Sequence, residues 1–418
     1  MFGKKKTEVL VAGAGPVGQF AALSLAKRGV QVEIVDTGIW ACSHSYALAL
    51  HPDALELLDH FNLRDAALDL AYPVCHIGIY DEAERRARIV LADEYDPRTC
   101  MPVLRQDTIE ALLEKALAEA GVKIRWRSEV ADLASNVDHV LAKVNRLKRD
   151  SRGYIVAHSE WIVDKTEKFD VPFVIGADGF ESETRRCLGV DFEEVGASDY
   201  YAVFEFQTDA NLEGEMRICF ANGTTNVLWP LPGGSCRWSF QLPDASGNET
   251  TRDKDRMLIS GGMDRSSTLD DAHLRQFLNE RAPWFNGSID HVSWRMVVRF
   301  ERRLAESFGQ HRMWLVGDAA HSTGPVGVQS MNLGLFEAWD FGHAIARVLH
   351  EGAPLSEVQN CGMRWQAEWR TLHGLDGGLK AGVNADSWIA SKTTELLSCI
   401  PAHGRKLGQL AGQIGLSL

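Results

Sequence analysis

Short apolar runs open the chain and alternate with a helical pattern. Residues 9–11 are apolar and lead directly into the glycine-rich residues 13–18. Residues 16–27 place apolar side chains four positions apart, as the buried face of a helix does. Residues 30–35 indicate a second strand, which closes on Asp36. A strand, a helix and a strand in this order predict a β-α-β unit whose two strands are parallel.

Apolar periodicity predicts further helices and strands in the first half of the chain. Helices are expected at residues 52–61 and 107–120. A hairpin is expected at 76–91, strands at 122–126, 130–144, 161–163 and 171–176, and a charged turn at 164–170. The last of these strands ends at a second glycine-bearing motif.

The pattern changes between about residue 190 and residue 299, where strand-like runs dominate. The runs are residues 200–206, 216–220, 225–229, 236–242 and 294–300. Polar turns separate them, among them Asn222-Gly223, which is typical of tight hairpins. These runs predict an inserted, mostly antiparallel sheet. A strand at 313–317 and a helix at 332–349 then return to the first pattern, and the rest mixes helices and loops.

Charge and hydropathy narrow the classes of partner. The chain has 44 Lys and Arg residues against 57 Asp and Glu residues, a net charge of −13. Such a surface repels phosphate backbones, so nucleic acid is not expected as a partner. No apolar run approaches the ~20 residues of a membrane helix, and no secretory signal is recognised. We therefore expect a cytoplasmic protein that does not bind a membrane.

The eight cysteines are scattered without a Cys-x-x-Cys pair. Cys42 with His44, and Cys75 with His76, come nearest to a metal-ligand pair, and neither has a second half nearby. We expect isolated, buried thiols rather than disulfides or a metal site.

The first glycine motif has the spacing of a dinucleotide-binding turn. Gly13 permits the tight turn, Gly15 lets the backbone approach a pyrophosphate, and Gly18 allows the helix to pack closely on the strand. The phosphates would lie at the helix N-terminus, where free N–H groups favour negative charge. Asp36 stands where a carboxylate accepts hydrogen bonds from an adenosine ribose. A merely glycine-rich turn would leave Asp36 unexplained.

Two more aspartates follow predicted strands. Asp178 follows residues 174–177, and Asp318 follows residues 314–317. Ligands of open α/β sheets bind beyond the carboxyl ends of the strands, so both carboxylates can face one crevice. Each aspartate alone could simply stabilise its turn. Together with the first motif they indicate contacts to one cofactor.

The second and third motifs resemble those of a known family. Residues 176–185, with Asp178 and Gly179, are similar to the Asp-Gly motif of the single-component FAD-dependent aromatic hydroxylases, the para-hydroxybenzoate hydroxylase family. Residues 317–334 resemble the family's Gly-Asp motif and flavin loop, and Arg105-Gln106 resembles a further FAD contact. The resemblance spans roughly residues 7–350 and is weak between 190 and 300, where family members differ by substrate.

The resemblance implies an α/β fold. A Rossmann-like FAD-binding domain of the GR2 type would carry an inserted, mainly antiparallel β-sheet substrate domain and a helical C-terminal part. The FAD-binding domain is expected at residues 1–73, 98–190 and 300–350. The substrate-binding sheet is expected at 74–97 and 191–299, and the helical region at 351–418.

The resemblance also implies roles for the motif residues. The backbone of the first motif would hold the pyrophosphate of FAD, Asp36 the ribose, and Arg105 the phosphate-ribose portion. Asp318 would lie near the pyrophosphate or ribitol, and Asp178 serves FAD and the transient approach of NAD(P)H. The flavin loop, at a helix N-terminus, would stabilise charge on the reduced ring. The expected cofactor contacts are Gly13, Gly15, Pro16, Val17, Gly18, Asp36, Thr37, Arg105, Val130, Asp178, Gly317, Asp318, Pro325, Gly327, Val328, Gln329, Ser330, Met331 and Asn332.

Five positions depart from the family pattern. Tyr46 and Asp53 stand where arginines are frequent, which bears on a phosphate contact. Val328 and Ser330 replace common glycines of the flavin loop, and Gly324 replaces one of a usual proline pair, which bears on flavin movement.

Catalytic side chains are not required by this chemistry. In this class reduced flavin captures O2 as a hydroperoxide, and the protein contributes orientation and water exclusion. His321 is a candidate base, with capping or packing beside Asp318 as the alternative. The inserted sheet offers candidate substrate contacts, with core or surface positions as their alternative. They are Tyr201, Phe204, Arg217, Trp229 and Phe240, together with the carbonyl of Pro325 at the flavin–substrate junction.

We therefore expect an FAD-dependent monooxygenase that hydroxylates a small aromatic or heteroaromatic substrate with O2 and NADH or NADPH. No second dinucleotide motif is present, which is consistent with a nicotinamide cofactor that binds only transiently. A monomer or homodimer without metal is expected. The alternatives are another flavin-dependent oxidation, such as Baeyer–Villiger insertion or epoxidation, and a non-catalytic FAD-binding redox protein.

Overall fold

A six-stranded sheet carries the three glycine motifs. The computed structural model describes residues 6–40, 47–92, 96–136, 138–152, 158–243 and 269–418. The strand order is β17-β18-β11-β1-β2-β7, and all neighbouring pairs except β17 and β18 are parallel. The strands are β1 (Val9–Ala12), β2 (Val32–Val35), β7 (Ile124–Arg125), β11 (Phe173–Gly176), β17 (Gly309–Gln310) and β18 (Met313–Leu315). The predicted parallel β-α-β unit is confirmed.

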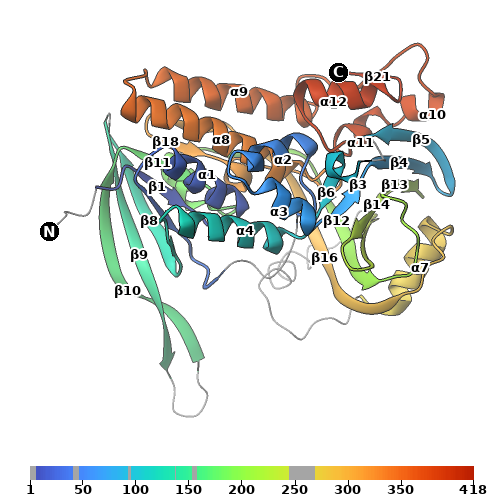
Figure 1. Ribbon diagram of the computed structural model, residues 1–418, viewed down its shortest axis with the longest axis horizontal. Coiled ribbons are helices and arrows are strands. Elements are labelled where there is room, and N and C mark those ends of the chain that lie inside the picture. Colours follow the sequence, from blue (N-terminus) through green and yellow to red (C-terminus); the bar gives the residue numbers. More distant parts are fainter. Residues whose placement is uncertain (1–5, 41–46, 93–95, 137, 153–157, 244–268) are drawn as a thin grey trace.

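Long helices pack around this sheet. The helix α1 (Pro16–Lys27) has the predicted bounds and lies against α4 (Gln106–Glu119) and α8 (Gln329–His350). The helix α9 (Ser356–Leu372) runs beside α8 (Figure 1). Shorter helices are α2 (Pro52–Asp59), α3 (Arg64–Asp69) and α5 (Glu183–Leu188).

The predicted inserted sheet is present and has eight strands, in the order β19-β16-β12-β15-β14-β13-β4-β5. They are β4 (His76–Asp81), β5 (Glu84–Val90), β12 (Phe192–Gln207), β13 (Glu215–Ala221), β14 (Thr224–Leu231), β15 (Ser235–Leu242), β16 (Asp290–Ala305) and β19 (His321–Ser322). Only β4 and β13 pair in parallel. The predicted hairpin β4–β5 thus extends a sheet formed mainly by residues far downstream.

The two faces of this sheet pack into different apolar clusters. Along β12, Tyr201 and Val203 belong to the main core, whereas Phe204 and Phe206 belong to a second cluster. This alternation follows from the opposite directions of successive side chains in a strand. The second cluster is covered by α7 (Asp271–Arg281), a helix that the sequence pattern did not predict.

A third sheet corrects one expectation. Its strands β8 (Ser128–Ser135), β9 (Val140–Arg152) and β10 (His158–Val171) are antiparallel neighbours. The charged turn predicted at residues 164–170 is wrong, because β10 continues through it with one irregularity between Val163 and Lys165. One ion pair joins the two strands, between Lys148 of β9 and Asp164 of β10 at 3.1 Å. The run is a solvent-facing strand.

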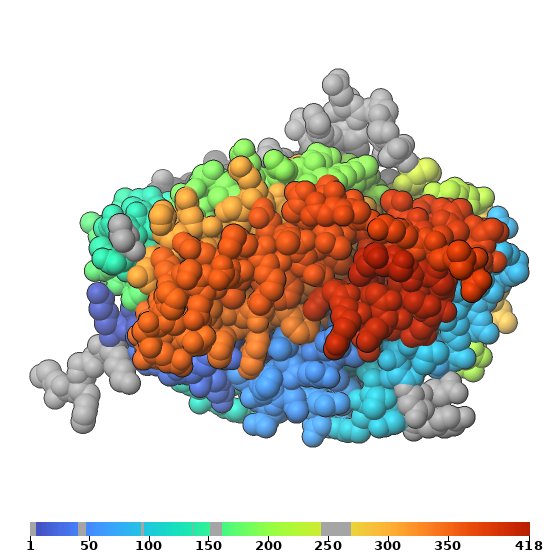
Figure 2. Space-filling model, turned by 90° about the horizontal axis from the view of Figure 1, so that it is seen from above, coloured from blue at the N-terminus to red at the C-terminus, as the bar shows by residue number. Residues whose placement is uncertain are grey.

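The C-terminal residues form short elements that reach the inserted sheet. They are α10 (Ser387–Ala390), α11 (Thr393–Leu397), α12 (Gly404–Gly412), β20 (Lys380–Ala381) and β21 (Leu416–Ser417). The amide of Gln413 bonds both backbone groups of Val90 on β5, at 2.8 and 2.9 Å. Figure 2 shows these red residues lying against the light-blue region of β4 and β5.

Cys75 and Cys100 form a disulfide, so the expectation of isolated thiols is wrong for this pair. The strands β3 (Tyr72–Val74) and β6 (Met101–Val103) pair antiparallel with Val74 opposite Met101. This register brings Cys75, which follows Val74, opposite Cys100, which precedes Met101. The described free thiols are Cys187, Cys219, Cys236, Cys361 and Cys399, and Cys42 lies outside the described residues.

The described ranges contain neither a metal-binding cluster nor a helix that could span a membrane. Three or more His, Cys, Asp or Glu side chains nowhere gather there in a way that could hold a metal ion. Within the same ranges, every helix is too short or too polar to cross a membrane.

Candidate active site

The three glycine motifs lie side by side at one edge of the first sheet. The strands β18, β11 and β1 are neighbours, and their carboxyl ends lead into the three motifs. The contact is close, since a Cβ added to Gly13 would lie 2.1 Å from the carbonyl oxygen of Ala177. A Cβ on Gly317 would lie 3.2 Å from the side chain of Val17. The predicted convergence of remote turns is therefore found.

The glycines of the first motif have two different roles. Gly13 has a φ of +97°, and a Cβ on Gly18 would lie 2.1 Å from the carbonyl oxygen of Gly13, so both serve chain packing. Around Gly15, in contrast, no described atom comes within 4 Å of an added Cβ. Pro16 begins α1 directly after it. Open space beside the N-terminus of a helix fits an anionic group such as a pyrophosphate.

Asp36 holds the first motif against the end of β2. Its Oδ2 accepts a hydrogen bond from the N–H of Ala14 at 2.6 Å, and its Oδ1 accepts one from Gly38 at 2.6 Å. The carboxylate is part-buried, so it keeps an accessible edge, and its neighbour Thr37 is exposed.

Asp178 stabilises its own turn. The carboxylate accepts hydrogen bonds from the N–H of Thr184 at 2.9 Å and from its Oγ1 at 3.0 Å, and another from the hydroxyl of Ser182. These contacts fix the start of α5. They match the turn-stabilising interpretation of this residue.

Asp318 directly follows Gly317, just beyond the end of β18. Its side chain is accessible to solvent, although nearby protein partly desolvates the carboxyl group. Desolvation raises the pKa of the Asp318 carboxyl, while the charge of His321 and a hydrogen bond from Ser330 act to lower it.

His321 is packed rather than presented to solvent. The ring is fully buried, stacks on Trp369 at 3.7 Å between centroids, and lies 2.8 Å from a carboxylate oxygen of Glu337. A base must reach its substrate. The structure therefore favours packing over catalysis for this residue.

The flavin loop, here residues 324–332, is held by hydrogen bonds to two other segments, residues 49–51 and residues 397–400. The side chain of Asn332 bonds the carbonyls of Ala49 and Val328 and accepts from the N–H of His51. The Nε2 of His51 donates to the carbonyl of Gly327 at 2.9 Å, and burial lowers the pKa of His51 to about 3. Gln329 donates to the carbonyls of Leu397 and Ile400 in the C-terminal part.

Val328 departs from the family pattern at a demanding position. It caps α8 with a φ of +44°, in the left-handed region that glycine adopts most easily. Met331 is buried behind it, and Asp53 lies in the first turn of α2. Tyr46 lies outside the described residues.

Arg105 faces the inserted sheet. Its Nε and Nη2 donate to Oε2 of Glu205, at 3.2 and 3.0 Å, while Arg237 bonds the other oxygen. Two guanidinium groups thus share one buried carboxylate, and Arg105 remains one-third exposed. Val130, the remaining expected contact, is a buried residue of β8.

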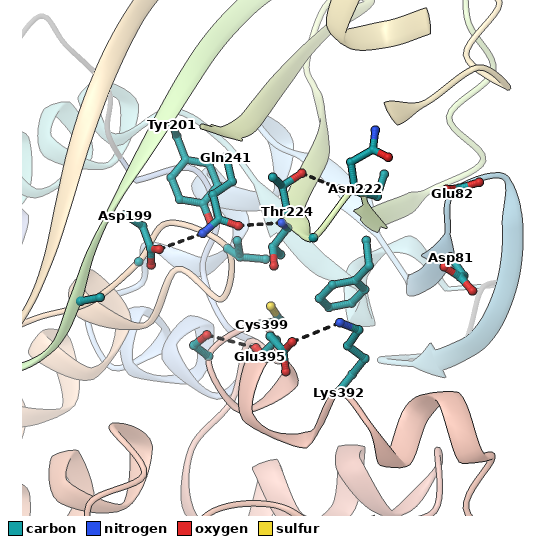
Figure 3. A pocket seen from close by; sticks show the side chains of 18 of the residues that line it. Asp81, Glu82, Asp199, Tyr201, Asn222, Thr224, Gln241, Lys392, Glu395 and Cys399 are labelled. Carbon is teal, nitrogen blue, oxygen red and sulfur yellow. Dashed lines mark hydrogen bonds and ion pairs between the residues drawn. The ribbon is translucent and has the colours of Figure 1, made fainter. Parts of the chain in front are cut away.

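A cavity of about 420 Å³ lies where three parts of the chain meet. Its walls are the inserted sheet, the flavin loop at Gly324 and Val326, and the C-terminal segment around α11 (Figure 3). The polar lining is extensive. It consists of Asp81, Glu82, Asp199, Tyr201, Asn222, Thr224, Thr225, Gln241, Arg302, Lys392, Glu395 and Ser398.

Of the predicted substrate contacts, only Tyr201 lines this cavity. Pro325 lies between two lining residues. Phe240 stacks on Trp238 at 4.9 Å in the second cluster, which also holds Phe204, and Trp229 is buried in the main core. Arg217 bonds Glu215 at 2.8 Å and lies over Trp284. Phe204, Arg217, Trp229 and Phe240 thus pack against other side chains and do not line this cavity.

Sequence reasoning missed the wall made by residues 388–399. Lys392, Glu395, Ser398 and Cys399 line the cavity from a segment without a recognisable motif. It also missed Asp199 and Gln241, which bond each other at 2.8 Å. Strand alternation places Asp199 on the face of Tyr201, and that was the available signal.

Comparison with known proteins gives a consistent picture. A family model described as an FAD binding domain matches residues 6–359. The 6-methylpretetramide 4-monooxygenase of Streptomyces rimosus is 29% identical over 349 residues, which cover 82% of this chain and 56% of that protein. The pentachlorophenol 4-monooxygenase of Sphingobium chlorophenolicum is 26% identical over 355 residues, covering 81% and 58%. The chain thus spans a little over half the length of these two relatives.

Solved structures share the fold. The p-nitrophenol 4-monooxygenase PnpA from Pseudomonas putida DLL-E4 superposes with a TM-score of 0.67 at 18% identity, over 98% of this chain and 92% of that one. The flavin-dependent monooxygenase PieE, solved with FAD and substrate, gives a TM-score of 0.68 at 18% identity, over 87% and 62%. The predicted fold class is confirmed.

Proposed function

Since the chain belongs to the FAD binding domain family, we propose that it is an FAD-dependent monooxygenase that hydroxylates an aromatic substrate. Two relatives carry names of enzymes that act on phenols, pentachlorophenol and para-nitrophenol, which supports an aromatic substrate here. NADH or NADPH and O2 would be the co-substrates. A monomer or homodimer in the cytoplasm, and the domain boundaries set out above, remain predictions.

The residues present fit FAD. Bound FAD would supply the redox chemistry that activates O2. The open space at Gly15 and the N-terminus of α1 would accept its pyrophosphate, and Asp36 would offer its accessible edge to a ribose. The fixed loop at Gly327 and Asn332 would position the ring beside the cavity and keep water out.

The observation that carries the proposal is the position of the cavity. Residues of the flavin loop and of the inserted sheet both line it, so a ring bound there lies next to the loop. Its volume of about 420 Å³ exceeds the roughly 150 Å³ that holds benzene in an engineered cavity. A substituted ring or more than one ring therefore fits, and a bare phenol leaves space unfilled.

A turnover experiment tests the proposal. The purified protein should bind FAD, and a panel of phenols, aminobenzoates and fused-ring phenols should contain compounds that accelerate NADH or NADPH oxidation. Product mass after reaction under labelled O2 should show one incorporated oxygen atom. A protein that cannot be reconstituted with FAD would overturn the proposal, and FAD binding without stimulated turnover would favour a non-catalytic redox protein.

A further inference from the structure

Arg302 is the arginine of β16 that lines the cavity. Its side chain is 27% exposed and extends along Gly196 of the paired strand β12. A Cβ on Gly196 would lie 2.9 Å from Cδ of Arg302, so the glycine leaves room for this side chain. The glycine opposite it therefore allows Arg302 to lie at the cavity wall.

The contacts of Arg302 leave much of its hydrogen-bonding capacity unused. A guanidinium group has five N–H donors. Nη2 lies 3.4 Å from Oγ of Ser398, and Nε lies 3.8 Å from Oδ2 of Asp199. Within the described part of the chain, Nε is buried without a hydrogen-bond partner. Its strand neighbour Arg303, by contrast, donates to the carbonyl of Phe192 at 2.9 Å.

Asp199 does not satisfy this arginine. Its Oδ1 accepts a hydrogen bond from Gln241 at 2.8 Å, and its Oδ2 is beyond hydrogen-bond distance of Arg302. Lys392, the other cation of the lining, pairs with Glu395 at 3.2 Å. Arg302 is thus the lining cation whose charge is least compensated by a neighbouring side chain in the described structure.

We propose that Arg302 anchors an anionic oxygen of the substrate, a carboxylate or a phenolate. The guanidinium would give that oxygen charge-assisted hydrogen bonds. The hydroxyls of Ser398 and Tyr201 line the same cavity and add donors. Burial raises the pKa of Tyr201 well above its usual value, so Tyr201 keeps its proton and can donate.

The acidic residues of the lining set the orientation of the bound ring. Asp81 and Glu82 lie at the end of the cavity opposite Asp199 and Tyr201 (Figure 3). An anionic oxygen is therefore repelled from that end and attracted to Arg302. Arg302 contacts Ser398, and the backbone of Ser398 packs against the flavin loop, since a Cβ on Gly327 would lie 2.6 Å from the Ser398 carbonyl oxygen. The Arg302 end of the cavity is therefore next to the flavin loop.

Ligand binding to the FAD-loaded full-length protein tests the inference, which rests on the proposed function. The carboxylate arm compares benzoate with benzamide, and the phenolate arm compares p-nitrophenol, above its pKa, with p-nitroanisole. Binding is followed by difference absorbance. In at least one arm the wild type should bind the anion more tightly than the matching neutral compound. Arg302→Gln should weaken binding of the anion by about tenfold or more and should leave binding of the neutral compound unchanged.

Three variants separate recognition from folding. Arg302→Lys should keep part of the preference for the anion, because it keeps the charge. Asp199→Asn should strengthen anion binding, because it removes the carboxylate that faces the same guanidinium. Arg299→Gln is the matched control, since Arg299 is 31% exposed on the same strand and does not line the cavity. Its Nε, like that of Arg302, has no hydrogen-bond partner among the described residues.

Several outcomes would overturn the inference. One is that Arg302→Gln loses affinity equally for the anion and for its neutral partner. Another is that the wild type prefers neither anion over its neutral partner. The third is that Asp199→Asn binds the anion more weakly. Failure of the proposed function would look different, as loss of FAD binding or of stimulated NAD(P)H oxidation in the wild type.

Discussion

Glu337 on α8 is the buried carboxylate around which the third motif is built. It accepts hydrogen bonds from the N–H of Gly317 at 2.8 Å, from Nε2 of His321 at 3.0 Å and from Nε1 of Trp369 at 2.7 Å. Three donors compensate a fully buried acceptor. The same contacts occupy His321, which explains why a histidine in a cofactor motif serves the packing of the turn.

Gly13 should be intolerant of any side chain. Gly13→Ala places a Cβ 2.1 Å from the carbonyl oxygen of Ala177 at a φ of +97°. We expect loss of FAD binding and destabilisation by roughly 2 kcal/mol or more, measured by flavin retention and denaturant unfolding. Gly121→Ala is the control, because Gly121 has a φ of +81° with open space around it, and should cost only about 1 kcal/mol. Equal effects would contradict the packing argument.

The neutral state of His51 should make the protein acid-sensitive. Burial lowers the pKa of His51 from 6.5 to about 3. Between these two values His51 is protonated in the unfolded chain and neutral in the folded protein, so protonation favours unfolding. Stability is then lost as the pH falls towards 3, by about 1.4 kcal/mol per pH unit. Urea unfolding of His51→Gln should show a shallower pH dependence between about pH 6 and about pH 5. The exposed His291→Gln should keep the wild-type slope, and an unchanged slope in His51→Gln would count against this origin.

Elements were predictable where their hydrophobic pattern is local. The helix α1, the hairpin β4–β5 and the strands β13 to β15 follow directly from periodicity and turn residues. The strand predicted at residues 161–163 covers only part of β10, because residues 164–170 are mostly charged and their backbone pairing with β9 cannot be seen in one segment. The disulfide was missed for the same reason, since it depends on the register of β3 against β6.

The disulfide should stabilise the hairpin that extends the inserted sheet. It joins two residues 25 positions apart, and β4 and β5 lie between them. A loop of this length predicts roughly 3 kcal/mol from the restricted unfolded chain. Reduction, or the double change Cys75→Ser and Cys100→Ser, should lower the thermal midpoint, and reductant should leave the double variant unchanged. A wild-type midpoint that ignores reductant would show that the bond is not formed in solution.

At the scale of the molecule, the convergence of the three motifs was predictable and the lining of the cavity was not. Strand order brings Gly13, Asp178 and Asp318 to one edge of the sheet, and each motif can be recognised from the spacing of its own residues. The cavity instead depends on where the C-terminal segment lies across β5 and the flavin loop. Aromatic character alone could not separate Tyr201 at the cavity from Phe240, which faces α7.

The contact between the flavin loop and the C-terminal segment should couple the two halves of the site. A Cβ in Gly327→Ala would lie 2.6 Å from the carbonyl oxygen of Ser398, so either the loop or the segment must shift. We expect weaker FAD binding together with faster amide hydrogen exchange at residues 396–400. Gly324→Ala has open space around its Cβ and should leave exchange there unchanged. FAD loss without a change in exchange would argue that the coupling is absent.

The interleaving of the two large sheets has a consequence for synthesis. The strand β4 pairs with β13, which the ribosome makes more than a hundred residues later, and β11 pairs with β18 near residue 313. Neither sheet can close until most of the polypeptide has emerged. The nascent chain must therefore carry unpaired strand edges for much of its elongation, and fragments that stop before β18 should recruit chaperones rather than fold.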